Sequence, residues 1–144
     1  MEKLNSIFFY NLERSIKAYR QYAQTILKAH GYSITIDQWL ILKAIIDDPD
    51  IAQNELAEAV FKDKASINRI IDLLIRHKYL TREKLKENRK FRQLTVTRLG
   101  HQILADLNSI VIKNRAQALK GISIAEIERT EKVLIRIFNN CKSK

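Results

Sequence analysis

Residues 63–77 read DKASINRIIDLLIRH, and this stretch decides the fold. Its apolar side chains recur at helical spacing and share one face, while small and polar side chains fall on the opposite face. Asp63 is a predicted N-cap for a helix over residues 64–77. The apolar positions are Ile67, Ile70, Ile71 and Leu74, and the opposite positions are Ala65, Asn68, Arg69, Asp72 and Arg76.

The segments on either side of this helix complete a recognisable unit. A short apolar pattern over residues 53–60 predicts a helix a few residues upstream, and two consecutive helices joined in this way are typical of a helix-turn-helix. Downstream, residues 80–85 and 91–96 have the composition of strands and are separated by the polar residues 86–90. This pattern predicts a hairpin wing, with Leu94 and Val96 facing the core.

Long helices are predicted at both ends of the chain. Residues 4–29 form one amphipathic pattern that Gly31 ends, and a Thr35–Gln38 capping box opens a second helix that runs to about residue 46. Residues 99–119 and 123–141 carry further apolar stripes, the last after a Ser123–Glu126 capping box. These stripes exceed what a small winged lobe can cover. They therefore predict a homodimer, with an intramolecular helical bundle as the alternative.

The predicted fold is mainly α with a small β-hairpin wing. Residues 1–144 form a single unit, in which residues 30–100 are a winged helix-turn-helix lobe. The N- and C-terminal helices, in residues 1–29 and 101–144, form a helical dimerisation region.

The positive charge of the chain is concentrated in one quarter of its length. The formal net charge is +10, and residues 62–98 hold twelve Lys or Arg against four Asp or Glu, which accounts for +8 of it. Such a concentration favours a polyanionic partner over an ordinary solvated surface, where the two signs usually mix. The single cysteine, Cys141, excludes an internal disulfide framework, and we expect a cytoplasmic location.

A recognition helix meets the major groove of double-stranded DNA with its first turns, where Asn pairs with adenine, Arg with guanine, and Lys or Ser holds phosphate. A small side chain at the tip allows close approach. In the wing, basic residues in a loop could approach phosphates or a narrow minor groove. The predicted DNA-binding residues are Lys64, Ala65, Ser66, Asn68 and Arg69 in the helix, and Arg89, Lys90 and Arg92 in the wing. The alternative for Arg69 is a simple surface ion pair with Asp72.

An ordered series of short motifs resembles the MarR/SlyA-type regulators. The series comprises Gly31 with Thr35-Ile-Asp-Gln-Trp39, Asn54-Glu-Leu-Ala57, Asp63-Lys-Ala-Ser-Ile-Asn-Arg69, Leu73-Leu-Ile-Arg-His-Lys-Tyr-Leu80 and Thr97-Arg-Leu-Gly100. Three positions depart from the family pattern: Asn88 and Lys90 replace an Asp-x-Arg signature of the wing, Phe61 replaces a turn Gly, and Ala52 replaces a Thr or Ser cap.

The resemblance implies a dimer with interlocked terminal helices that binds a palindromic operator, commonly as a repressor. It also implies that a small aromatic or phenolic ligand binds between the dimer helices and the DNA-binding lobe. Tyr19, Tyr22, Trp39 and His101 are candidates to line such a pocket, and packing in the core is the alternative role for these residues.

Other classes of function find less support in the sequence. It contains no dinucleotide or phosphate-binding loop and no metalloprotease motif, so we expect no enzymatic activity and no cofactor. His30, His77 and His101 are scattered, which predicts no metal site. No stretch approaches the roughly 20 apolar residues that span a bilayer, so no membrane association is expected. Two alternatives stay open: a nonspecific architectural DNA-binding protein, and a winged-helix module that binds other proteins.

Overall fold

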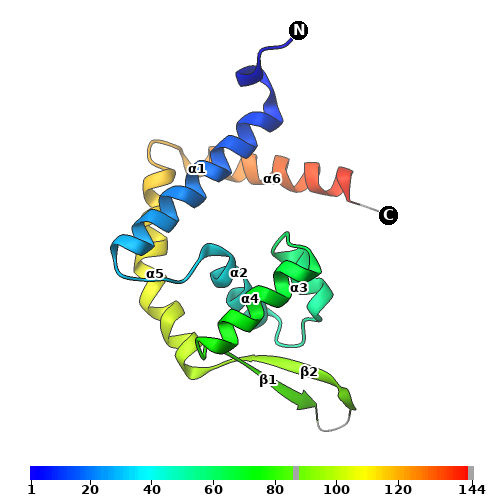
Figure 1. The fold of residues 1–144 in the computed structure, drawn as a ribbon. Coiled ribbons are helices and arrows are strands. Elements are labelled where there is room, and N and C mark those ends of the chain that lie inside the picture. Colours follow the sequence, from blue (N-terminus) through cyan, green and yellow to red (C-terminus); the bar gives the residue numbers. More distant parts are fainter. Residues whose placement is uncertain (86–87, 143–144) are drawn as a thin grey trace.

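The structure is a computed structural model that describes residues 1–85 and 88–142, with the side chains of residues 84–92 outside the described part. It confirms the predicted fold class, because the described residues form helices and a short antiparallel hairpin that projects from the helical body (Figure 1). The helices are α1 (Phe8–Ala29), α2 (Ile36–Asp47), α3 (Gln53–Ala59), α4 (Lys64–Arg76), α5 (Arg98–Ala118) and α6 (Ile124–Cys141). The strands are β1 (Leu80–Leu85) and β2 (Asn88–Val96).

The core lies where α2, α3 and α4 pack against one another and against the start of the hairpin. Ile41, Leu56, Ile67 and Leu74 are completely buried there, which confirms the apolar face predicted for α4. The terminal helices also contribute to this core, through Leu27 of α1 and Leu107 and Ile110 of α5. Both long helices are therefore anchored on the lobe at one end, while their other ends extend away from it (Figure 1).

Gly100 allows α5 to begin directly against the lobe. A Cβ at this position would collide with the carbonyl oxygen of Tyr79 and lie 2.7 Å from Cγ1 of Val96. The hydroxyl of Thr97 accepts a hydrogen bond from the Gly100 backbone N–H at 3.0 Å and caps the helix. The closing Thr97–Gly100 motif of the sequence therefore serves to join the hairpin tightly to α5.

The N-terminus corrects one predicted helix. Residues Leu4–Ser6 form a separate 3-10 turn, Ile7 is extended, and α1 begins only at Phe8. Two local side-chain bonds compete with the helix: Ser6 Oγ donates to the Lys3 carbonyl at 2.7 Å, and Asn11 Nδ2 donates to the Asn5 carbonyl at 2.9 Å. Such bonds offer the backbone an alternative to helical pairing, which explains the break at Ile7.

The wing corrects a second boundary. β2 begins at Asn88, and Leu85 pairs with Asn88, so Arg89 and Lys90 lie in the strand and not in a loop. The sequence predicts a start at Phe91, because only residues 91–96 carry the apolar pattern. Backbone pairing between strands does not require apolar side chains, and here, after an irregularity in the register between Lys84 and Leu85, β1 pairs again with β2 at Asn88. The predicted loop residues Lys86 and Glu87 lie outside the described part.

Phe61 shows what the departure from a turn glycine means for the backbone. Its φ is +61°, in the left-handed region that favours glycine, and its side chain is 81% exposed. The N–H groups of Phe61 and Lys62 donate to the carbonyls of Glu58 and Ala57, which closes the end of α3. At the other end of α3, Ala52 offers no side-chain cap, but its N–H donates to Oε1 of Glu55 at 3.3 Å. The helix-turn-helix thus forms despite both departures.

Candidate nucleic-acid interface

The exposed face of α4 carries the side chains predicted to read DNA. Lys64, Ala65, Asn68 and Arg69 are exposed, and Ser66 is partly exposed, while the opposite face of the helix is buried. Asp63 caps the helix, as predicted, by accepting a hydrogen bond from the Ser66 backbone N–H at 2.7 Å. The first turns of α4 therefore present a fixed set of small, polar and basic groups toward solvent.

A chain of hydrogen bonds orders part of this face. The Ser66 hydroxyl lies 3.0 Å from Asp63 Oδ2 and accepts from Nη2 of Arg69 at 3.2 Å. The pKa of Asp63 is held below its usual range. The main cause is the hydrogen bond from the Ser66 backbone N–H, and the bond to the Ser66 hydroxyl and the nearby charge of Arg69 add to it. Arg69 does not pair with Asp72, contrary to the alternative considered for it; Asp72 instead lies 3.7 Å from Nη2 of Arg82 in β1.

Asn68 has a partner on the neighbouring helix that the sequence did not reveal. The side-chain amide of Gln53, at the start of α3, donates a hydrogen bond to Oδ1 of Asn68. This leaves the Nδ2 group of Asn68 available to donate to a base or a phosphate. Fifteen residues separate the two side chains in the sequence, and only the packing of α3 on α4 brings them together.

The hairpin is attached to the lobe beside α4. Nε2 of Gln93 in β2 donates to the carbonyl of Pro49 at 3.3 Å, and Leu94 and Val96 pack on the core as predicted. Arg89, Lys90 and Arg92 belong to β2, but their side chains lie outside the described part, so their contact with DNA stays a prediction.

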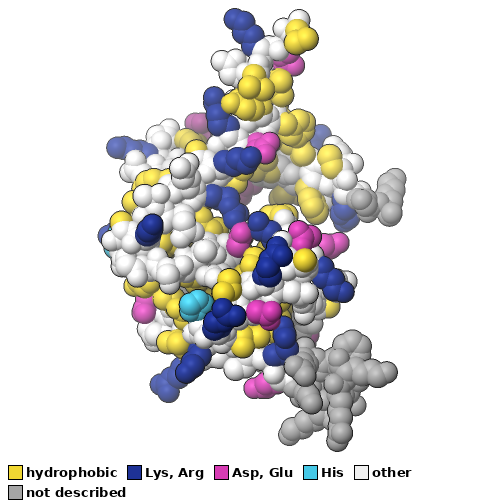
Figure 2. All heavy atoms as spheres, viewed as in Figure 1, with side chains coloured by type: hydrophobic (Ala, Val, Ile, Leu, Met, Phe, Trp, Pro, Cys, Tyr) yellow, Lys and Arg dark blue, Asp and Glu magenta, His cyan; other side chains and the backbone are white. Residues whose placement is uncertain are grey.

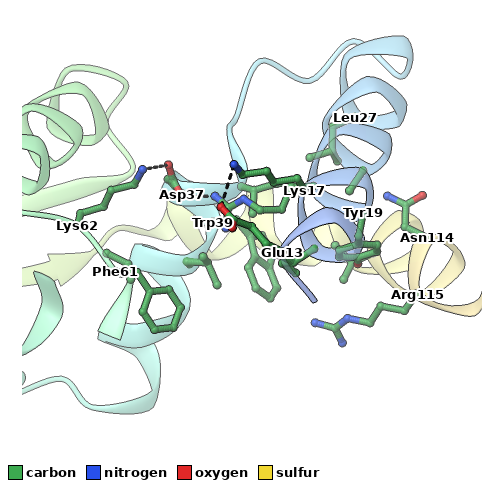
Figure 3. Close-up of a pocket in the computed structure, with 17 residues that line it drawn as sticks. Glu13, Lys17, Tyr19, Leu27, Asp37, Trp39, Phe61, Lys62, Asn114 and Arg115 are labelled. Carbon is green, nitrogen blue, oxygen red and sulfur yellow. Dashed lines mark hydrogen bonds and ion pairs between the residues drawn. The ribbon is translucent and has the colours of Figure 1, made fainter. Parts of the chain in front are cut away.

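The candidate pocket residues do not share one site. A cavity of about 770 Å³ opens between α1, α2, α5 and the turn after α3, and it is lined by Tyr19 and Trp39 (Figure 3). His101 instead lines a smaller hollow of about 180 Å³ behind the wing, and Tyr22 is 38% exposed and lines neither.

The larger cavity combines an apolar wall with basic and polar groups. The guanidinium of Arg115 lies 5.8 Å from the centre of the Trp39 ring. Asn114 is only 4% exposed and lines the cavity. The Asn114 amide and the Arg115 guanidinium could therefore serve a bound polar molecule.

Over residues 1–85 and 88–142, no three His, Cys, Asp or Glu side chains gather as metal ligands would. None of the helices described is both long and apolar enough to cross a bilayer.

These features together define a winged helix-turn-helix protein of the DNA-binding type. Residues 30–90 match the model of the MarR family. This match supports the resemblance seen in the motifs, and the chain has the winged-helix fold of that family's transcriptional regulators.

Several solved structures are similar to this chain over nearly its whole length. The transcriptional regulator PA3341 is 27% identical, with a TM-score of 0.80 over 93% of this chain and 97% of that one. BpsR of Bordetella bronchiseptica, whose structure concerns regulation of its DNA binding by 6-hydroxynicotinic acid, is 17% identical, with a TM-score of 0.84 over 95% and 96%. A MarR/EmrR family regulator from Acinetobacter sp. ADP1 is 16% identical, with a TM-score of 0.85 over 96% and 97%. The last two show the shared fold.

Proposed function

We propose that the chain is a homodimeric, sequence-specific transcriptional repressor that binds an inverted-repeat operator. The observation that carries the proposal is the exposed face of α4, which presents Asn68 and Arg69 on a helix that contacts strand β1 of the hairpin. Asn68 and Arg69 would read base edges in the major groove, and Lys64 and Ser66 would hold phosphates. Arg89, Lys90 and Arg92 would contact the backbone or the minor groove next to it.

The homodimer is supported by apolar surface that a single chain leaves uncovered. None of the eighteen residues of α6 is buried, although Ile135 and Phe138 are large and apolar. The N-terminal half of α1 likewise exposes Phe8, Phe9 and Ile16, and Figure 2 shows hydrophobic side chains gathered along both segments. Patches of this kind mark interaction surfaces, and a second copy would cover them by a two-fold arrangement. We therefore assign residues 1–29 and 101–144 to the dimerisation region.

The larger cavity is a candidate effector site. Trp39 and Tyr19 offer aromatic surface, and Arg115 and Asn114 offer a cation and an amide, so a small aromatic molecule with an acidic group fits its chemistry. The structurally similar protein BpsR supports the proposal, because 6-hydroxynicotinic acid regulates its DNA binding. Binding of such a ligand would release the operator.

The proposal is tested by selecting binders from a pool of random duplexes at low and moderate salt and sequencing those retained. We expect enrichment of an inverted repeat with half-sites about one helical turn apart, because a two-fold dimer sets two recognition helices about 34 Å apart. Retention that falls with salt but enriches no sequence would indicate an architectural DNA-binding protein. No retention would favour a protein-interaction module.

A further inference from the structure

Asp37 joins two cations that come from different parts of the chain. It lies in the first turn of α2, and its Oδ1 accepts from Nη2 of Arg20, which belongs to α1. Its Oδ2 lies 3.3 Å from Nζ of Lys62, which belongs to the turn between α3 and α4 (Figure 3). Each carboxylate oxygen thus holds one cation, and three segments of the chain meet at a single side chain.

This ion-pair cluster is better placed than an ordinary surface pair. The Asp37 side chain is 22% exposed, and those of Arg20 and Lys62 are 36% and 37% exposed, whereas fully exposed pairs contribute little. The position of Asp37 is fixed by the capping box of Thr35 and Gln38, whose two hydrogen bonds measure 3.0 and 3.1 Å. Its charge also lies at the N-terminus of α2, where the helix dipole favours a carboxylate.

Lys62 connects the cluster to the recognition helix. It immediately precedes Asp63, the N-cap of α4, and its backbone N–H closes the end of α3 by donating to the Ala57 carbonyl at 3.0 Å. A displacement of Lys62 would therefore move the first turn of α4, which carries the predicted base-reading side chains. Arg20, at the other end of the cluster, lies on the helix that we assign to the dimerisation region.

We propose that Asp37 is a positioning residue that couples the dimerisation helix α1 to the first turn of α4, and thereby holds the two recognition helices of a dimer at the spacing of the operator. The inference rests on the proposed function and deepens it. All three side chains also line the larger cavity, so an anionic ligand there would compete with Asp37 for Arg20 and Lys62.

Charge alone predicts the opposite outcome for a variant of Asp37. Asp37→Asn removes a negative charge and frees two cations, which would leave binding to a polyanion unchanged or strengthen it. A loss of operator affinity in this variant would therefore report lost positioning. Asp47→Asn is the matched control, because it removes a carboxylate from the same helix, one that pairs with Lys43 at 3.5 Å on an exposed surface.

The experiment measures the dissociation constants of the wild-type protein and of the variants Asp37→Asn, Arg20→Met and Asp47→Asn for the selected operator and for a random duplex. We expect Asp37→Asn and Arg20→Met each to weaken operator binding about tenfold, within the range usual for coupling between sites. Random-duplex binding should not weaken in Asp37→Asn and should weaken less than operator binding in Arg20→Met, and Asp47→Asn should match the wild type. The double variant Arg20→Met/Asp37→Asn should lose no more than Asp37→Asn alone, because both changes remove the same contact.

Two results would overturn the inference. One is a folded Asp37→Asn protein that binds the operator as tightly as the wild type; the other is an equal loss on operator and random duplex. If Asp37→Asn does not fold, Arg20→Met decides, because it keeps most of the aliphatic stem of the side chain and removes the guanidinium that pairs with Asp37. A wild-type protein that selects no operator would contradict the proposed function itself, which is a separate failure.

Discussion

Replacing Phe61 by glycine should stabilise the protein, although it removes a large aromatic side chain. The backbone of Phe61 is left-handed, with φ at +61°, and that conformation costs a residue with a Cβ roughly 1 to 2 kcal/mol. Glycine avoids this cost but gains freedom in the unfolded chain, which offsets about 0.4 to 1 kcal/mol. The ring is 81% exposed and contributes little burial. We therefore expect the free energy of unfolding to rise by about 0.5 to 1 kcal/mol.

Urea denaturation followed by circular dichroism measures this change, at one fixed protomer concentration because dimer stability depends on concentration. Phe61→Ala is the control: it removes the same ring but keeps the strained backbone, so it should not stabilise. Gly31, which ends α1 with φ at +86°, shows the residue that this kind of helix end favours. A Phe61→Gly protein less stable than Phe61→Ala would refute the reasoning, because both variants lack the ring and only the left-handed backbone at residue 61 favours glycine over alanine.

Three further predictions follow from named contacts. Asn68→Ala should cost roughly 1 to 3 kcal/mol of binding free energy on the selected operator and little on random DNA, and equal losses in a binding titration would contradict base reading. Gly100→Ala should lower the free energy of unfolding by about 1 to 3 kcal/mol, because the new Cβ meets the Tyr79 carbonyl; an unchanged midpoint in thermal denaturation would show that this carbonyl can yield. Phe138→Asp should shift sedimentation from dimer to monomer, whereas the neighbouring polar change Asn139→Asp should not; a Phe138→Asp dimer would place the interface elsewhere.

Helix α4 could be predicted because its signals are local. The spacing of Ile67, Ile71 and Leu74 and the cap at Asp63 all fall within one short segment, and the structure places them as expected. The capping box at Thr35 is local in the same way. The boundary of β2 depends instead on pairing with β1, which side-chain patterns report poorly, and it was set too late at Phe91.

Contacts between distant segments could not be predicted from sequence. Gln53 reaches Asn68 only because α3 packs on α4, and Arg20 reaches Asp37 only because α1 packs on α2. For the same reason, the sequence could not predict which of the candidate pocket residues line the same cavity. Trp39 lines the larger cavity and His101 the smaller hollow, because helical spacing alone does not fix which sides of different helices face each other.

The most direct test of the central claim, that a dimer reads two half-sites with two α4 helices, varies the spacing within the selected operator. Inserting about five base pairs between the half-sites places them on opposite faces of the duplex, where two helices related by a two-fold axis cannot both reach the major groove. We predict that affinity for this duplex falls to that of random DNA, while inserting about ten base pairs restores the shared face of the two half-sites but not their separation. Unchanged affinity after the five-base-pair insertion would contradict the account.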